Sequence, residues 1–261
     1  MKVAEFDGIR ANMYEQALEE YPLARINDLN AMKKLLNPKI GEKILGFGEG
    51  NGYFCKDISD SVGKSGTYFI TDPSKDQLFN LKNKLNYSQI KIKVMSADEL
   101  VVPKNFFDKI WSFGAFHHCK NKIAAMKNVF EALKPGGVAV ICDVFSGSKL
   151  TRHFDIQVAK YCITGHDVEF MTDKSARKLC SESGFNSKNI IIKNLPQKWI
   201  FNSEYDLGDF IYKLHAMTKI PGKEEDKIKE VIRGCKEILG VKKVEKHYEL
   251  NWPMKVLIAK K

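Results

Sequence analysis

The sequence lacks the features that would place it in a membrane or a secretory pathway. It contains no run of 18 apolar residues, and its first residues lack the apolar stretch of a signal peptide. None of its six cysteines forms a Cys-x-x-Cys pair, so the pattern predicts neither a zinc ribbon nor a disulfide framework. We therefore expect a soluble, cytoplasmic protein with no membrane span and with reduced thiols.

Arginine is also scarce, although the net charge is +10. Five of the 42 basic residues are arginines; the rest are lysines spread along the chain among acidic residues. Arginine is the side chain that best contacts bases and phosphates in a bidentate way. The charge therefore indicates a lysine-rich solvated surface, and nucleic acid is not the partner we expect.

The composition is that of a folded α/β protein. The chain has 261 residues, of which 44% are apolar and 11% aromatic, enough to bury a substantial core. This length fits one large domain, or one core domain with an insertion. The sequence shows no internal repeat and no low-complexity tract, and it does not indicate an oligomeric state.

Residues 43–54 carry the strongest local signal. Apolar Ile44 and Leu45 run into alternating glycines, and apolar residues resume at Tyr53. A buried strand that ends in such a loop and continues as a helix allows close approach of a ligand to the backbone. The free backbone N–H groups of the loop point toward that ligand.

The pattern of strand followed by helix then repeats. Asp72 ends the next strand, about where a nucleoside-binding α/β unit places the acid that holds ribose hydroxyls. Further strands are predicted at 90–95, 108–113 and 138–144. Because ligand-type residues follow these strands, the sequence predicts a doubly wound parallel sheet with its site at the carboxyl edge.

Residues 43–144 resemble the core of class I S-adenosylmethionine-dependent methyltransferases. The resemblance is carried by five motifs in order: Leu45-Gly-Phe-Gly-Glu-Gly-Asn-Gly52, Asp72-Pro-Ser74, Ala97-Asp98-Glu-Leu100, Phe107–Phe113 with His117-His118, and Leu133-Lys-Pro-Gly-Gly137. It implies a Rossmann-like, seven-stranded, doubly wound α/β sheet with an antiparallel last strand. It further implies S-adenosyl-L-methionine as cofactor and, from the fourth motif, a small-molecule methyl acceptor.

The resemblance also implies the residues of a cofactor site. The glycine loop would face the methionine and ribose, Asp72 would hold the ribose, Asp98 would accept from the adenine amino group beside Ala97, and Phe113 with Gly114 would line the methionine end. The candidates from the resemblance are Gly46, Gly48, Glu49, Gly50, Asn51, Gly52, Asp72, Pro73, Ala97, Asp98, Phe113 and Gly114. Tyr14 and Arg25 are added from the N-terminal helical segment: each is either a surface helix residue or part of a segment that lies across the mouth of the site. One position departs from the family, because Gly46 stands where an acid is usual. Glu49 is the nearby acid that could take over its role.

The flanks are expected to cover this site. Residues 1–40 read as a helical segment across the mouth, and 41–194 with 248–261 as the methyltransferase core. Within the core, 145–172 is a polar, lid-like stretch. Residues 195–247 read as a helical insertion between strands six and seven.

Two histidines are the candidate catalytic residues. His117 and His118 follow strand four, where the methyl group would be presented, and histidine is suited to proton transfer near neutral pH. Each is either a base or a group that orients the acceptor, or it only packs against the next helix. His153 and His166 are expected to be structural. No metal-type spacing such as His-x-x-x-His occurs, so no metal site is predicted.

Missing motifs narrow the function further. The chain lacks the Asn/Asp-Pro-Pro-aromatic motif of base-amine methyltransferases, the Pro-Cys of cytosine enzymes and the paired glutamates of arginine methyltransferases. The alternatives are an RNA or tRNA methyltransferase that uses the basic surface, and a non-catalytic cofactor-binding protein, prompted by Gly46. A nicotinamide-dependent dehydrogenase would need Gly-x-Gly-x-x-Gly, which the alternating glycines do not match.

Overall fold

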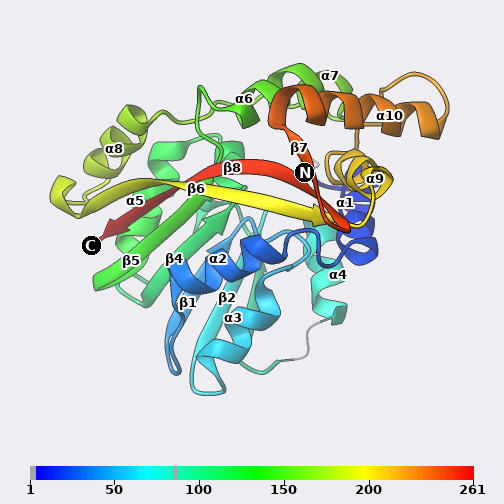
Figure 1. Cartoon of the computed structure of the whole chain (residues 1–261). Coiled ribbons are helices and arrows are strands. Elements are labelled where there is room, and N and C mark those ends of the chain that lie inside the picture. Colours follow the sequence, from blue (N-terminus) through cyan, green and yellow to red (C-terminus); the bar gives the residue numbers. More distant parts are fainter. Residues whose placement is uncertain (1–3, 85–86) are drawn as a thin grey trace.

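A computed structural model describes residues 4–84 and 87–261. A mixed eight-stranded sheet forms its centre, in the order β3-β2-β1-β4-β5-β8-β6, with β7 paired to β8 (Figure 1). The strands are β1 Lys43–Phe47, β2 Thr67–Asp72, β3 Ile90–Val94, β4 Phe107–Phe113, β5 Leu133–Asp143, β6 Ile190–Phe201, β7 Val241–Val244 and β8 His247–Lys260. Strands β1 to β5 are parallel and β8 is antiparallel to β5 and β6, which confirms the predicted Rossmann-like class.

Helices cover both faces of the sheet, since its central strands are apolar on both sides. The helices are α1 Ile9–Glu20, α2 Ile26–Leu36, α3 Cys55–Val62, α4 Lys75–Lys84, α5 Lys122–Ala132, α6 Lys149–His153, α7 Ala159–Tyr161, α8 Asp173–Glu182, α9 Glu204–Leu214 and α10 Glu224–Gly234. In β1, Ile44 packs with the residues of α2 to α4, whereas Leu45 packs with those of α5 and α8. This alternation is the period of two that a strand imposes.

The structure corrects the sequence reading at three places. Strand β6 continues to Phe201, so the first residues assigned to the insertion belong to the strand. The insertion adds a strand of its own, β7, which makes eight strands in place of seven. The stretch 145–172, described from the sequence as polar and lid-like, contains the helices α6 and α7, which are joined by a π-helical turn at Phe154–Val158. The helical period is hidden there because polar residues interrupt it.

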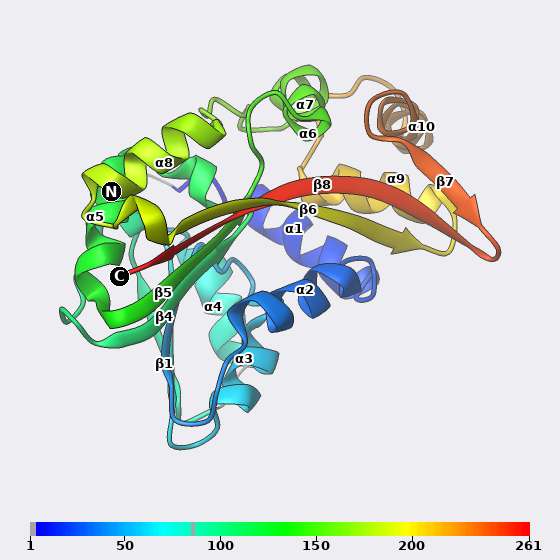
Figure 2. The same ribbon diagram turned by 60° about the vertical axis from the view of Figure 1, so that its left-hand side comes forward.

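Strands β6 and β8 extend well beyond the rest of the sheet. Strand β8 pairs with β5 only from Lys255 to Lys260, yet it pairs with β6 along its length, from Tyr248 to Ala259. The half of this antiparallel strand pair that is not bonded to β5 curves away from β5 and reaches α9 and β7 (Figures 1 and 2). We call residues 195–201 and 248–254 the hairpin arm.

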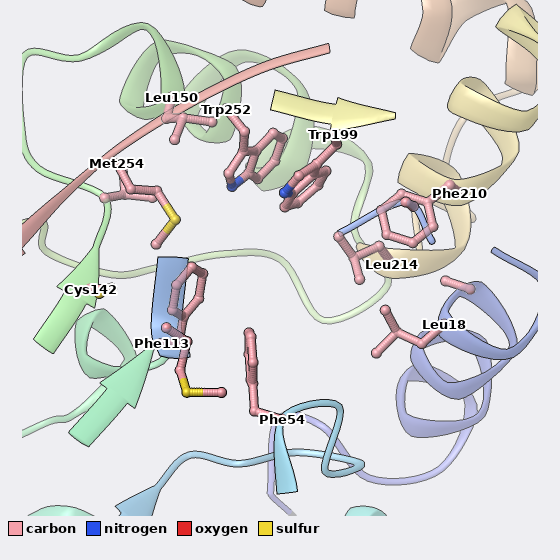
Figure 3. Close-up of a cluster of buried hydrophobic side chains, with 14 of the residues drawn as sticks. Leu18, Phe54, Phe113, Cys142, Leu150, Trp199, Phe210, Leu214, Trp252 and Met254 are labelled. Atoms are coloured by element: carbon pink, nitrogen blue, oxygen red, sulfur yellow. The ribbon is translucent and has the colours of Figure 1, made fainter. Parts of the chain in front are cut away.

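The hairpin arm lies over a large apolar cluster. Figure 3 shows Trp199 and Trp252 of the arm stacked on each other, and their ring centroids are 3.8 Å apart. Four other side chains point toward the same region: Met254 from β8, Phe113 from β4, Leu214 from α9 and Leu18 from α1. The arm thereby joins the N-terminal helices to the core domain. Among the described residues, no helix combines the length and apolar character needed to cross a bilayer.

Candidate functional site

The glycine loop follows β1 at the carboxyl edge of the sheet. Gly48 and Gly50 adopt φ values of 67° and 57°, a left-handed conformation that glycine adopts without steric cost. A Cβ at Gly48 would lie 2.3 Å from the Cβ of Ala115, so the loop after β4 packs directly on it. The Gly48 N–H donates to the Thr71 carbonyl at 2.8 Å. The loop is therefore held between the ends of β2 and β4.

Asp72 organises this loop from the end of β2. Its two carboxylate oxygens accept from the N–H groups of Gly50 at 2.9 Å and Ser74 at 2.8 Å. Burial raises the pKa of Asp72 to about 6, although these two bonds act in the opposite direction. Each oxygen keeps a further lone pair, so the carboxylate can accept from a ligand hydroxyl as well.

The carboxyl group of Glu49 lies in the space beside Gly46, where the family usually has the side chain of an acid. The Glu49 side chain folds back under the loop, and a Cβ on Gly46 would lie 1.9 Å from its Oε1 and 2.6 Å from the Tyr68 hydroxyl. Tyr68 in turn accepts a hydrogen bond from Trp111 Nε1 at 3.1 Å, and Cys55 Sγ lies 3.6 Å from Glu49 Oε2. The space for a side chain at residue 46 is thus filled by the carboxyl group of residue 49.

The protonation of Glu49 should make stability depend on pH. Burial raises its pKa from 4.5 to about 8, so the folded protein holds a proton here that the unfolded chain releases. Stability from this group is full below about pH 4.5 and falls as pH rises toward 8, by up to about 1.4 kcal/mol per pH unit. Glu49→Gln, which cannot ionise, should remove this slope in urea unfolding between pH 5 and 8. If the free energy of unfolding depends on pH in the same way in the two proteins, Glu49 is not a buried, protonated group.

A cavity lies beside the loop, under the hairpin arm. It has a volume of about 80 Å³, and residues of the arm, α1 and the lid-like stretch line it. Six residues singled out in the sequence line it: Tyr14, Arg25, Phe113, Gly114, His117 and His118. Tyr14 also approaches the glycine loop, since its ring lies 3.6 Å from the Cβ position of Gly50. The N-terminal segment therefore contributes to the cavity wall and to the surroundings of the glycine loop.

Arg25 reaches the cavity from a buried ion pair. Its Nε donates to Asp28 Oδ2 at 2.9 Å, and Trp199 Nε1 donates to the same oxygen at 2.9 Å. The Asp28 side chain is fully buried. The Arg25 guanidinium also lies 5.6 Å from the ring of Phe113. This network fixes α2 to the hairpin arm and holds a cation at the cavity wall.

His117 is oriented by an acid of β5. Asp143 is fully buried, and its Oδ1 lies 2.6 Å from His117 Nδ1, while its Oδ2 accepts from the His117 backbone N–H at 2.9 Å. Nε2 is left as the nitrogen available on the cavity side. An imidazole held by a carboxylate in this way is an oriented acceptor for a proton or a cation.

The other histidines near the cavity are held neutral. Burial, together with the neighbouring His117, lowers the pKa of His118 to about 4 and that of His166 to about 2. Burial likewise lowers the pKa of His215. At neutral pH these rings therefore present lone pairs, not charges.

Ten of the sixteen predicted site residues lie outside the cavity lining: Gly46, Gly48, Glu49, Gly50, Asn51, Gly52, Asp72, Pro73, Ala97 and Asp98. Asp98 is half-buried and accepts from the Asn121 N–H, at the start of α5, at 3.2 Å. The structure also brings in residues that the sequence reading left out or took as structural: Phe6, Arg10, Phe154, His166, Trp199, Leu214, His215, Trp252 and Met254. Most lie in the flanks, where no motif marked them; the concentration of histidine and tryptophan there was the available signal.

With the geometry described, comparison with known proteins becomes informative. A family model described as a methyltransferase domain matches residues 44–137, the strands and loops that carry the glycine loop, Asp72 and the histidine pair. Residues 44–137 are therefore a methyltransferase domain of the class I, S-adenosylmethionine-dependent type. The match ends before the lid-like stretch and the hairpin arm.

Curated relatives match over the same part of this chain. The ubiquinone/menaquinone biosynthesis C-methyltransferase of Coxiella burnetii is 30% identical over 109 residues, which are 40% of this chain and 44% of the relative. The enzyme of that name from Neisseria meningitidis is 28% identical over 107 residues, with the same coverage. The chain thus spans less than half the length of the curated relatives it matches.

Solved structures share the fold over nearly the whole chain. The YcgJ protein of Bacillus subtilis has a TM-score of 0.63 at 16% identity, over 90% of this chain and 98% of that one. Phosphoethanolamine N-methyltransferase 2 of Haemonchus contortus, solved with S-adenosyl-L-methionine, has a TM-score of 0.65 at 17% identity, over 96% and 56%. At this identity the likeness concerns the architecture alone.

Proposed function

We propose that this chain transfers the methyl group of S-adenosyl-L-methionine to a small-molecule acceptor in the cavity under the hairpin arm. The observation that carries the proposal is the meeting of three features at one sheet edge: the glycine loop, the Asp72 carboxylate and the His117–Asp143 pair. The named activities of the relatives, on quinones and on phosphoethanolamine, support a small acceptor. A cavity of this size lined by aromatic side chains also suits a small molecule better than a polymer.

The residues present fit the cofactor. The glycines leave the loop backbone accessible, Asp72 retains lone pairs for ribose hydroxyls, and Asp98 stands at the next strand end. Tyr14, Phe113 and Trp199 offer aromatic faces, which favour a sulfonium cation. When bound, the cofactor supplies an electrophilic methyl group, and the protein has to hold a nucleophile in line with it.

The chain's own contribution is orientation and exclusion of water. Placing two reactants in line can supply most of the acceleration of a displacement reaction. The lid-like stretch, α1 and the arm enclose the cavity, so they exclude water during transfer. Two roles are open to the His117 and His118 pair: to accept a proton from the acceptor, or to hold the acceptor in place. Gly46, Gly52 and Glu49 shape the loop from below.

Isothermal titration with S-adenosyl-L-methionine and its demethylated product tests the proposal. Binding of both is expected, and binding of neither would refute it. Asp72→Ala should weaken both affinities by about 10- to 100-fold, since a charged acceptor of hydroxyl groups is lost. Asp60→Ala, an exposed acid on α3, is the control and should leave both affinities unchanged. If the Asp72→Ala protein binds both ligands as tightly as the unsubstituted protein does, Asp72 does not bind the ribose.

A further inference from the structure

Histidines gather at the cavity to a degree that methyl transfer does not require. Five of the six histidines of the sequence lie around Phe154 and its neighbours: His117, His118, His153, His166 and His215. They come from the loop after β4, the lid-like stretch and the end of α9. Three of them, His117, His118 and His166, place one ring nitrogen each within 4.8 Å of the others.

We propose that His117, His118 and His166 bind a divalent transition-metal ion of the zinc type, with its open coordination position facing the cavity. Three imidazoles and one exchangeable position form the usual ligand set of a catalytic zinc site. The Zn–N distance of about 2.1 Å requires nitrogens roughly 3.4 Å apart. Small rotations of the rings close the remaining gap.

The outer contacts of the three rings leave one nitrogen of each free to ligate. Nδ1 of His117 faces Asp143 at 2.6 Å, and Nδ1 of His118 lies 2.9 Å from Glu5 Oε2. The Asp143–His117 contact matches the acid-to-histidine-to-metal arrangement that orients ligands in metalloproteins. The Glu5–His118 contact is a close approach without hydrogen-bond geometry. Nε2 of His166 is buried and has no hydrogen-bond partner among the described residues. A buried, unpaired ring nitrogen is costly unless something binds it.

Aromatic side chains pack against two of these rings. His166 is stacked on Phe154 at 4.7 Å and lies at 29° to Phe170, while His117 lies 5.3 Å from Phe170. Apolar walls around a polar centre strengthen its interaction with a cation. Arg10 also lines the cavity, but its positive charge is paired with the carboxylate of Glu5. The carboxylate of Asp143 is therefore the negative charge that offsets the charge of the metal ion.

The ion would act on the acceptor and not on the cofactor. A hydroxyl or thiol of the acceptor bound to the ion would release its proton to water more readily, because the cation stabilises the resulting anion. The electron pair of that anion would form the new bond to the methyl carbon as the carbon–sulfur bond of the cofactor breaks and the neutral demethylated product leaves. This step rests on the proposed function, whereas metal binding itself does not. The acceptor class that fits is a small molecule with a hydroxyl, enol or thiol group beside its methylation site.

Titration of the chelator-treated full-length protein with Co²⁺ tests the site, since tetrahedral Co²⁺ gives visible absorption bands. We expect one equivalent to saturate the bands and Zn²⁺ to remove them. His166→Ala, and separately His118→Gln, should weaken Co²⁺ binding at least about 100-fold, and Asp143→Asn about 10- to 100-fold. The control is His247→Ala, at the first residue of β8, which should change nothing.

Titration with the demethylated cofactor is run on the same samples, to show that each variant is folded and to separate this inference from the proposed function. Absence of bands in a protein that binds the cofactor would overturn the metal site alone. Bands that survive both His166→Ala and His118→Gln would overturn it too, because the ion would then lie elsewhere.

Discussion

Gly46→Asp is expected to destabilise the protein by at least about 3 kcal/mol and to abolish cofactor binding at room temperature. The new Cβ would lie 1.9 Å from Glu49 Oε1 and 2.6 Å from the Tyr68 hydroxyl. Overpacking of this kind costs about 1–3 kcal/mol, and a second buried carboxylate beside Glu49 adds a charge penalty. Urea unfolding and titration with S-adenosyl-L-methionine measure the two effects.

The compensating variant for this prediction is Gly46→Asp combined with Glu49→Ala. It moves the acid to the position usual in the family and frees the space that Glu49 fills. Most of the lost stability should return, and adding Tyr68→Phe should return more by removing the second clash. Glu49→Ala alone is the reference. If the two substitutions are simply additive, the carboxyl of Glu49 does not occupy the place of the missing acid.

Asp28→Ala is expected to cost about 3–5 kcal/mol of stability, since it leaves Arg25 buried without its counter-ion. It also removes the acceptor of Trp199 Nε1, so α2 and the hairpin arm lose their shared contact. The cavity wall depends on this contact, and cofactor affinity should fall together with stability. Urea unfolding and titration with the demethylated cofactor check both.

A matched control comes from the other arginine pair at the same spacing. Arg233 and Glu230 are also three residues apart on a helix, but the Arg233 side chain is 57% exposed, so Glu230→Ala should cost less than about 1 kcal/mol. The double variant Arg25→Met with Asp28→Leu should recover stability without recovering cofactor affinity. Recovery of both would show that Arg25 has no role at the cavity beyond packing.

The sequence predicted the core of the candidate site because short-range chemistry marks it. A glycine loop needs glycines at particular positions, and the acid at the end of β2 follows at a fixed distance, so both are visible in a linear pattern. The parallel strands were predicted from the same kind of pattern, whereas the antiparallel last strand was implied by the family resemblance. The role of Gly46 was noticed as a departure, but the sequence could not say that the Glu49 carboxyl fills that space.

The tertiary structure alone decided how the flanks complete the cavity. The length of the hairpin arm was misjudged because Pro196 and several lysines interrupt its alternating pattern, whereas pairing with β8 extends it to Phe201. His166 was taken as structural, since nothing near it in sequence marks a site. Its position beside His117 and His118 depends on packing between segments distant in the chain, and such long-range contacts leave no local pattern in a sequence.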